Sequence, residues 1–197
     1  GEDVRQGAQV DYHPSQLSAK DFYDILAGKQ SERLSKVMHT SNTSDVFIYW
    51  SGHGNDSEGP LWSDEDKEKA FGCKEIGQIV RDLHQQGKYR RMMLAVETCY
   101  SGLWGETLEG IPNVVVLTAA NTLESSKADV WDSQRQTYLS NGFTRAFRQA
   151  IDSNPDIKLR DLYLQLARST TGSHVMLYNE RHYGSVYLNG MGDYLEK

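Results

Sequence analysis

Five short apolar runs recur along the chain and predict β-strands. They are Val46–Trp50, Met92–Val96, Val114–Ala119, His174–Tyr178 and Ser185–Leu188. The first three contain almost no polar residue, which is typical of strands that are buried on both faces of a sheet.

Apolar residues between these runs return with the i, i+3, i+4, i+7 spacing of an amphipathic helix. The spacing predicts helices around Ile76–Leu83, Phe143–Ile151 and Leu159–Leu166. Gly87 is placed to end the first helix, and the Ser-Asn-Pro-Asp run at 153–156 separates the other two. Strands that alternate with helices predict an α/β fold in which a mostly parallel sheet is flanked by helices on both faces.

Polar residues follow two of the predicted strands at once, where ligands of parallel sheets usually bind. Gly52-His53-Gly54 follows the first strand, and Glu97-Thr98-Cys99 follows the second. One helical crossover joins the two strands, so we expect them to be neighbours about 4.8 Å apart. His53 and Cys99 could then address one substrate carbonyl between them.

A cysteine–histidine pair is the minimum apparatus for acyl transfer through a thiol. His53 would serve as base and then as acid. Gly54 would let a peptide approach the backbone, and its N–H could help to bind an oxyanion. Gly52 is expected to allow a sharp turn off the strand. Taken singly, Cys99 could be a packed core residue and His53 a turn residue.

Length and charge narrow the range of functions. The chain has 197 residues, enough for one domain over residues 1–197, and a formal charge of −6 with a sequence pI near 5.5. This charge gives no electrostatic reason to expect a nucleic acid or an anionic membrane as partner. No apolar run approaches the ~18 residues of a membrane span.

The remaining candidate chemistry is sparse. Two cysteines, Cys73 and Cys99, could form one bridge, and that bridge would silence either thiol. The acidic run Asp64–Asp66 lacks the alternating spacing of a cation loop. The other histidines lack the spacing of metal ligands and are expected to be structural or exposed: His13, His39, His84, His174 and His182. We therefore expect no metal and no cofactor.

Several longer stretches, in order, resemble the legumain family of asparaginyl endopeptidases, peptidase family C13 of the caspase-like clan. The stretches are Asp11–Leu26, Val46–Gly54, Gly87–Gly102, Asn113–Ser126, Arg135–Gly142 and Gly172–Asn179. The resemblance implies a caspase-like three-layer sandwich. It also implies a cysteine endopeptidase that cleaves after Asn, with Asp accepted at lower pH, through a Cys–His dyad and a thioester. The same family includes transamidases and peptide ligases, and a catalytically silent binding module is a further alternative.

The resemblance also implies roles for single residues. His53 matches the catalytic histidine, Cys99 the nucleophile, and the N–H groups of Gly54 and Cys99 the oxyanion hole. The family has Asp where this chain has Gly52, so no role of that Asp can be transferred.

Substrate-binding residues follow from the same match. Glu97 matches an acidic residue of the pocket for the side chain before the scissile bond, and Asn141 stands where legumain has a second pocket acid. Ser125 and Ser126 match the strand edge that pairs with the substrate backbone. Trp62 could wall the same groove.

The family's first two strands would precede Gly1. We therefore expect the chain to be a processed or truncated fragment of a longer precursor, with the N-terminal segment bound as a second chain beside a peptide or protein substrate. One consequence would be an enzyme that is inactive when this N-terminal segment is missing. The resemblance also implies an extracytoplasmic setting, secreted, periplasmic or lysosome-like.

Overall fold

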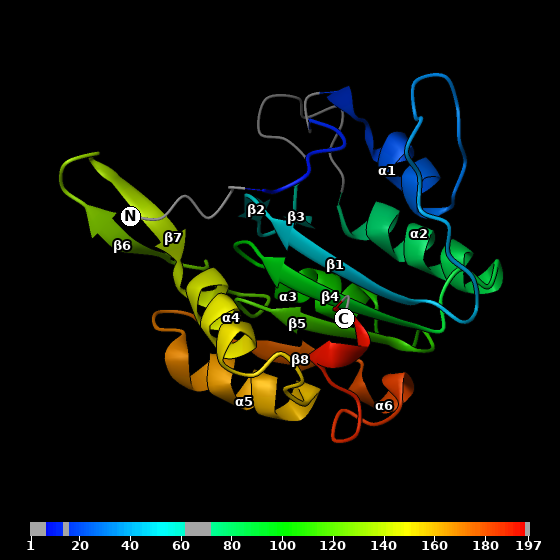
Figure 1. Ribbon diagram of the computed structural model, residues 1–197. Coiled ribbons are helices and arrows are strands. Elements are labelled where there is room, and N and C mark those ends of the chain that lie inside the picture. The colour runs from blue at the N-terminus through cyan, green and yellow to red at the C-terminus, as the bar shows by residue number, and fades with distance from the viewer. Residues whose placement is uncertain (1–6, 14–15, 62–71, 196–197) are drawn as a thin grey trace.

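The computed structural model describes residues 7–13, 16–61 and 72–195. A four-stranded sheet with the order β1-β4-β5-β8 lies at the centre of these residues (Figure 1). The strands are β1 (Asp45–Ser51), β4 (Arg91–Glu97), β5 (Val114–Thr118) and β8 (Met176–Tyr178). The first three are mutually parallel and β8 is antiparallel to β5, which confirms the predicted mostly parallel sheet.

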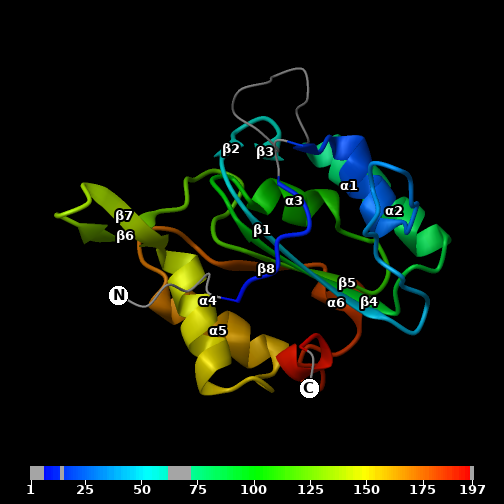
Figure 2. The ribbon, with the colours of Figure 1, turned by 45° about the horizontal axis from the view of Figure 1, so that its top comes forward.

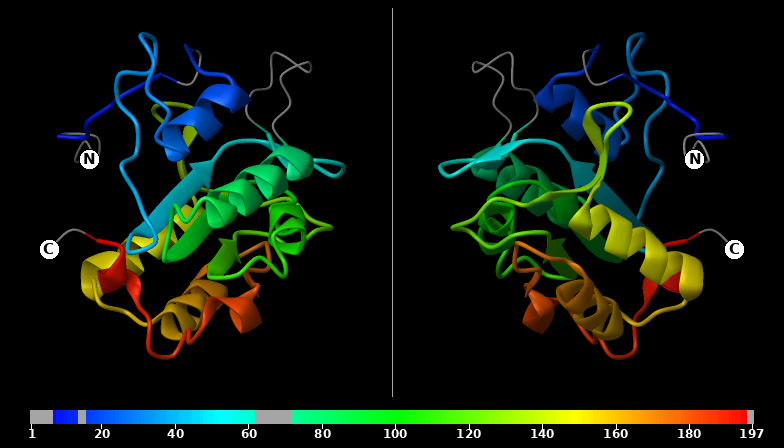
Figure 3. Two further views of the ribbon diagram at one scale, coloured as in Figure 1. Left: turned by 90° about the vertical axis from the view of Figure 1, so that its right-hand side faces the viewer. Right: turned by 90° about the vertical axis from the view of Figure 1, so that its left-hand side faces the viewer.

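Helices cover both faces of this sheet and complete a three-layer α/β sandwich (Figures 2 and 3). The helices are α1 (Ala19–Leu26), α2 (Cys73–Gln85), α3 (Gly102–Thr107), α4 (Gly142–Ser153), α5 (Leu159–Ser169) and α6 (Glu180–Tyr183), with a 3-10 turn η3 (Met191–Asp193). Alternate residues of the strands supply the two cores. Leu94 and Val96 pack with α1, α2 and α3, whereas Met93 and Ala95 pack with α4 and α5.

The apolar periodicity correctly predicted α2, the crossover helix that brings the two polar strand ends together. Helix α2 ends at the predicted stop, where Gly87 takes the left-handed conformation (φ 62°) just past the C-cap. The Ser-Asn-Pro-Asp run separates α4 from α5 as predicted. The crossover through α2 makes β1 and β4 parallel neighbours.

The predicted strand Ser185–Leu188 is wrong. These residues form a turn in which the Ser185 carbonyl accepts hydrogen bonds from the N–H groups of Leu188 and Asn189. Only Val186 is buried, while Tyr187 and Leu188 are exposed. A short apolar run with one buried side chain lacks the burial that would make a strand favourable.

Two short β-ribbons are not anticipated by the strand pattern. Strands β2 (Gly54–Asn55) and β3 (Gly59–Pro60) pair directly after β1, while β6 (Ala128–Asp132) and β7 (Thr137–Asn141) form a hairpin that projects from the body (Figures 1 and 2). On the hairpin, the Trp131 and Tyr138 rings meet edge to face, 4.9 Å apart, and both are exposed. The hairpin leads directly into α4 and so fixes where that helix begins.

A charged cluster closes the opposite end of the sheet. Asp45, at the start of β1, accepts hydrogen bonds from Arg90 at 2.5 Å and from Arg91 at 2.6 Å. Arg91 also bonds the Asn189 side chain and lies 3.6 Å from Asp193. The C-terminal part of the described chain is thereby joined to the first strand through β4.

We predict that Asp45→Asn lowers the free energy of unfolding by about 2 kcal/mol at pH 7, because it removes the nearer of the two anions that face the largely buried Arg91 and leaves only Asp193, at 3.6 Å. Burial raises the pKa of Asp45, but the bonds from Arg90 and Arg91 outweigh it and leave the pKa below its ordinary value. A carboxyl with a lowered folded pKa stabilises the protein above its unfolded pKa, and this contribution is lost as the pH falls through the folded pKa.

Urea unfolding at pH 7 and pH 3 measures this effect. The difference between wild type and variant should shrink at pH 3. The control is Asp152→Asn, which breaks the exposed pair with Arg148 and should cost less than about 0.5 kcal/mol. Equal losses in the two variants would contradict the prediction.

Candidate active site

The ends of β1 and β4 bring the predicted catalytic residues together. The ladder between them ends at the pair Ser51 and Glu97, and the Gly52 N–H then donates to the Glu97 carbonyl at 3.2 Å. Beyond this bond the two chains stay in contact. A methyl group built on Gly54 would lie 2.1 Å from the Cys99 carbonyl oxygen, so the Gly54 backbone packs directly on that of Cys99.

His53 lies at this junction with its side chain exposed. Its carbonyl accepts a hydrogen bond from the Leu61 N–H at 3.0 Å. Because bonded positions alternate along an antiparallel ladder, the N–H of Gly54 points away from β3. The Gly54 N–H therefore takes no part in the β2–β3 ladder and is directed away from that ribbon.

The two glycines beside His53 differ. Gly54 is required because its backbone touches Cys99. Gly52 has no left-handed φ, and a methyl group there would meet its nearest atom, the Leu61 carbonyl oxygen, at an ordinary 3.9 Å. The prediction that Gly52 is needed for a sharp turn is therefore not supported by its conformation.

Cys99 is half-buried and its thiol is free. The Sγ atom lies 4.0 Å from the Ser126 carbonyl oxygen. Tyr100, the next residue, has the left-handed φ of 54°, which is uncommon for a residue other than glycine. This strained turn lifts the chain off β4 immediately after the thiol, and the Glu124 carbonyl holds it by accepting from the Tyr100 N–H at 2.8 Å.

Glu97 is fully buried on the face of β4 that packs against α4. Burial raises the pKa of its carboxyl to about 7, against the opposing effect of the Ser126 hydroxyl and the Thr144 backbone. Among the described residues, no donor meets hydrogen-bond geometry with either carboxyl oxygen. Ser126 and Thr144 therefore lie near the carboxylate without forming well-aligned hydrogen bonds to it, and a buried acid so weakly bonded is costly to ionise.

Tyr49 and Thr144 complete the surroundings of Glu97, and the sequence patterns did not single them out. The two hydroxyls share a hydrogen bond of 2.7 Å between β1 and α4. Burial, with a smaller contribution from the Glu97 charge, raises the pKa of Tyr49 to about 12. The sequence does carry a signal that could have identified Tyr49. It is a tyrosine at an inward-facing position of a buried strand, two residues before the strand ends.

The remaining predicted binding residues flank the hairpin β6–β7. Ser125 and Ser126 form a half-exposed segment that leads into β6. Asn141 ends β7 opposite Ala128 and is the N-cap of α4, although its side chain makes no capping bond. The Asn141 amide is therefore not committed to the helix.

Other nucleophile candidates are excluded by their contacts. Cys73 is also free, so no bridge to Cys99 forms, and its Sγ donates to the Glu58 carbonyl at 3.2 Å. Burial raises the pKa of the Cys73 thiol. Ser101 is buried, and its hydroxyl is bonded to the Ala120 carbonyl and N–H. Trp62 and Asp64–Asp66 lie outside the described residues.

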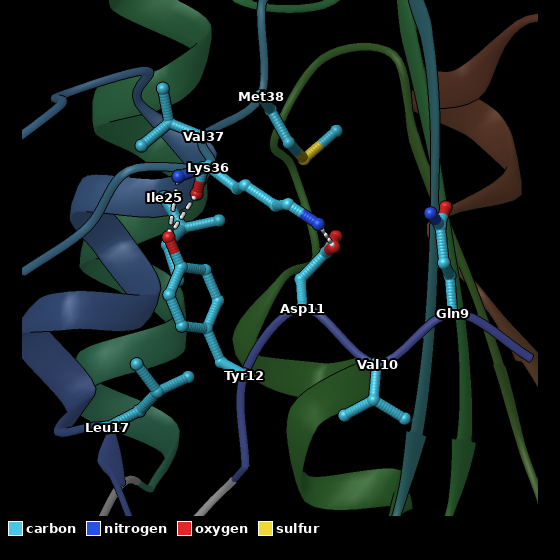
Figure 4. A pocket seen from close by; sticks show the side chains of 9 residues that line it. All are labelled: Gln9, Val10, Asp11, Tyr12, Leu17, Ile25, Lys36, Val37 and Met38. Carbon is cyan, nitrogen blue, oxygen red and sulfur yellow. Dashed lines mark hydrogen bonds and ion pairs between the residues drawn. The ribbon is translucent and has the colours of Figure 1, made fainter.

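A separate cavity of about 480 Å³ lies between the N-terminal segment and α1 (Figure 4). Its lining contains none of the predicted site residues. The Lys36 ammonium pairs with Asp11 at 2.5 Å, and the Tyr12 hydroxyl bonds the Lys36 backbone. Its polar groups are therefore occupied by one another rather than directed at a ligand.

The described parts of the chain contain no group of three His, Cys, Asp or Glu side chains arranged to hold a metal ion. Within the same residues, no helix is both long enough and apolar enough to cross a membrane.

Comparison with known proteins identifies the family of the chain. The family model described as "Peptidase C13 family" matches residues 1–192. Legumain from Homo sapiens is 31% identical over 189 residues, which cover 92% of this chain and 42% of that protein. Legumain from Bos taurus is 29% identical over 195 residues, covering 95% and 44%.

A vacuolar-processing enzyme delta-isozyme from Arabidopsis thaliana is 32% identical over 130 residues, covering 64% of this chain and 27% of the plant protein. The chain thus spans less than half the length of these curated relatives. The predicted family is confirmed over almost the whole chain: the protein belongs to the peptidase C13 family.

Proposed function

We propose that this protein is a cysteine endopeptidase of the legumain type, with Cys99 as nucleophile and His53 as general acid and base. The observation that carries the proposal is the packing of Gly54 on the Cys99 carbonyl, because it puts the two polar strand ends in contact. A free, half-buried thiol at a strained turn and an exposed imidazole on the neighbouring strand end meet the needs of thiol acyl transfer.

The proposed reaction has two halves. His53 takes the proton of the Cys99 thiol, and the thiolate attacks the carbonyl carbon before the scissile bond. The N–H groups of Gly54 and Cys99 bind the oxyanion, the C–N bond breaks, and the imidazolium protonates the leaving amine. Water then attacks the thioester, gives a proton to His53 and releases the acid with the free thiol.

Residues around Glu97 suggest the preferred substrate. A carboxylate without a protein donor is suited to accept from the N–H₂ of an Asn side chain, and the Asn141 amide can bond the Asn oxygen. With Asn141 in place of a second acid, the pocket carries one negative charge when Glu97 is ionised. Because the pKa of Glu97 is raised to about 7, the pocket becomes neutral at acid pH and should then accept Asp as well.

We predict that peptides that differ only in the residue before the cleavage site are cut after Asn at pH 8, where Glu97 is mostly ionised, and after Asn and Asp at pH 5. Fluorogenic peptides with Asn, Asp, Arg, Lys and Ala at that position measure this preference. Cys99→Ala is the inactive control and Cys73→Ala the matched thiol control, since Cys73 lies outside the site. Cleavage after Arg or Lys alone would contradict the proposed pocket, and cleavage that survives Cys99→Ala would contradict the nucleophile.

Further predictions concern the acceptor of the acyl group, a protein without catalysis, and the setting of the chain. Transfer to an amine in place of water would use the same thioester, and no contact of the described residues favours it. A binding module without catalysis remains the alternative if the peptides are not cut. An extracytoplasmic compartment, a single domain and an N-terminal segment bound as a second chain beside β1 are likewise still predictions.

A further inference from the structure

Three segments of the chain meet at one residue outside the catalytic pair, Glu124, two of them at its carboxylate and one at its backbone carbonyl. Oε1 of Glu124 accepts hydrogen bonds from the N–H groups of Asn121 at 3.1 Å and of His174 at 2.7 Å. Oε2 lies 2.9 Å from Nδ1 of the His174 ring. The Glu124 carbonyl accepts from the Tyr100 N–H at 2.8 Å. One residue therefore joins the turn after Cys99, its own loop and the segment before β8.

We propose that Glu124 and His174 form a clamp that positions both the nucleophile turn and the substrate-pairing edge. The proposal rests on the proposed function for its substrate. Glu124 directly precedes Ser125 and Ser126, and the Ser126 carbonyl faces the Cys99 thiol. A strained φ such as that of Tyr100 persists only when neighbouring contacts enforce it. The Glu124 carbonyl supplies that contact, and His174 anchors Glu124.

Exposure distinguishes this pair from a buried structural ion pair. The His174 side chain is 77% exposed and that of Glu124 23% exposed. Burial raises the pKa of Glu124, but the bonds from His174 and Asn121 leave it below its ordinary value, so the carboxylate stays charged in mild acid.

Other ionisable groups near the clamp lie on neighbouring segments. Tyr178 on β8 has its pKa raised by burial and by the charges of Glu106 on α3 and of Glu124. The Lys127 side chain lies over Gly172, two residues before His174.

The test compares His174→Ala with His182→Ala. His182 is a matched control, because its Nδ1 lies 3.9 Å from Glu109 in a second histidine–glutamate pair that belongs to α6. KM and kcat for the Asn peptide are measured at pH 5 and pH 8, together with the hydrogen-exchange rate of the Tyr100 amide by NMR. A third variant, Glu124→Gln, keeps the shape and one acceptor oxygen but removes the charge.

We expect His174→Ala to raise KM about three- to tenfold, with a kcat that changes less than KM. The Tyr100 amide should exchange faster in His174→Ala, with Glu124→Gln between that variant and wild type. Values for His174→Ala that equal those of His182→Ala at both pH values would overturn the clamp. If wild type cuts no peptide, the proposed function fails, while the Tyr100 exchange rate still decides the clamp.

Discussion

Replacing Gly54 with alanine should remove peptide cleavage and destabilise the fold. The added methyl group would lie 2.1 Å from the Cys99 carbonyl oxygen and 3.1 Å from the Gly59 carbonyl oxygen, and both are backbone atoms that cannot rotate away. Relief requires the ends of β1 and β4 to separate. We expect a loss of about 3 kcal/mol in unfolding free energy and at least about 100-fold in kcat/KM, because a shift of about 1 Å misplaces the reacting groups.

Gly52→Ala is the matched control on the other side of His53. Its methyl group would meet the nearest atom at 3.9 Å, and its backbone is not left-handed. We expect its unfolding midpoint in urea and its kcat/KM to stay near wild type. Thermal or urea unfolding and peptide cleavage are measured on both variants. A Gly54→Ala protein that is as active as Gly52→Ala would refute the close approach of the two strand ends.

The Glu97→Gln variant should be more stable than wild type at pH 8 and much less active. The folded pKa of Glu97 is about 7, above the ordinary value of 4.5, so the folded state holds the proton more tightly than the unfolded state does. Folding stability therefore falls as the pH rises from about 4.5 to about 7, by roughly 3 kcal/mol at 1.36 kcal/mol per pKa unit. Glutamine carries no charge and avoids this cost.

Urea unfolding at pH 4 and pH 8 measures the stability difference, which should be near zero in acid and favour the variant at pH 8. Cleavage after Asn should fall about 100-fold or more, because a site built to pair with a polar side chain discriminates strongly when the pairing is lost. Glu106→Gln, at an exposed position of α3, is the control. A gain in stability that is equal at both pH values would contradict an ionised, buried Glu97.

The elements predicted from the sequence are those whose periodicity matches their burial. Strands β1, β4 and β5 are apolar throughout because helices cover both of their sides, and α2, α4 and α5 each bury one apolar face. The hairpin β6–β7 was missed because its aromatic residues are exposed, so its pattern does not mark a core. The strand prediction for Ser185–Leu188 was wrong for the converse reason, because this segment contains apolar residues but forms a turn.

The candidate site was predictable where chain topology alone brings residues together. One crossover helix between two strands makes the ends of β1 and β4 neighbours and brings Gly54 against Cys99 whatever the side-chain details are. The roles of Tyr49, Thr144 and Glu124 depend on hydrogen bonds across 95 residues or on loop geometry, and no local pattern encodes such contacts. Glu97 was predictable as a site residue from the family resemblance, but its burial and its raised pKa depend on the packing of β4 against α4, which no local pattern encodes.

The cluster at the start of the sheet has a consequence for how the protein is made. Arg91 bonds Asn189, 98 positions further along the chain, and the same arginine binds Asp45. A ribosome synthesises and releases the strands β1, β4 and β5 long before it reaches Asn189. During that interval Arg91 can pair with Asp45 but not with Asn189, so the charged cluster is completed only after the C-terminal segment has been made.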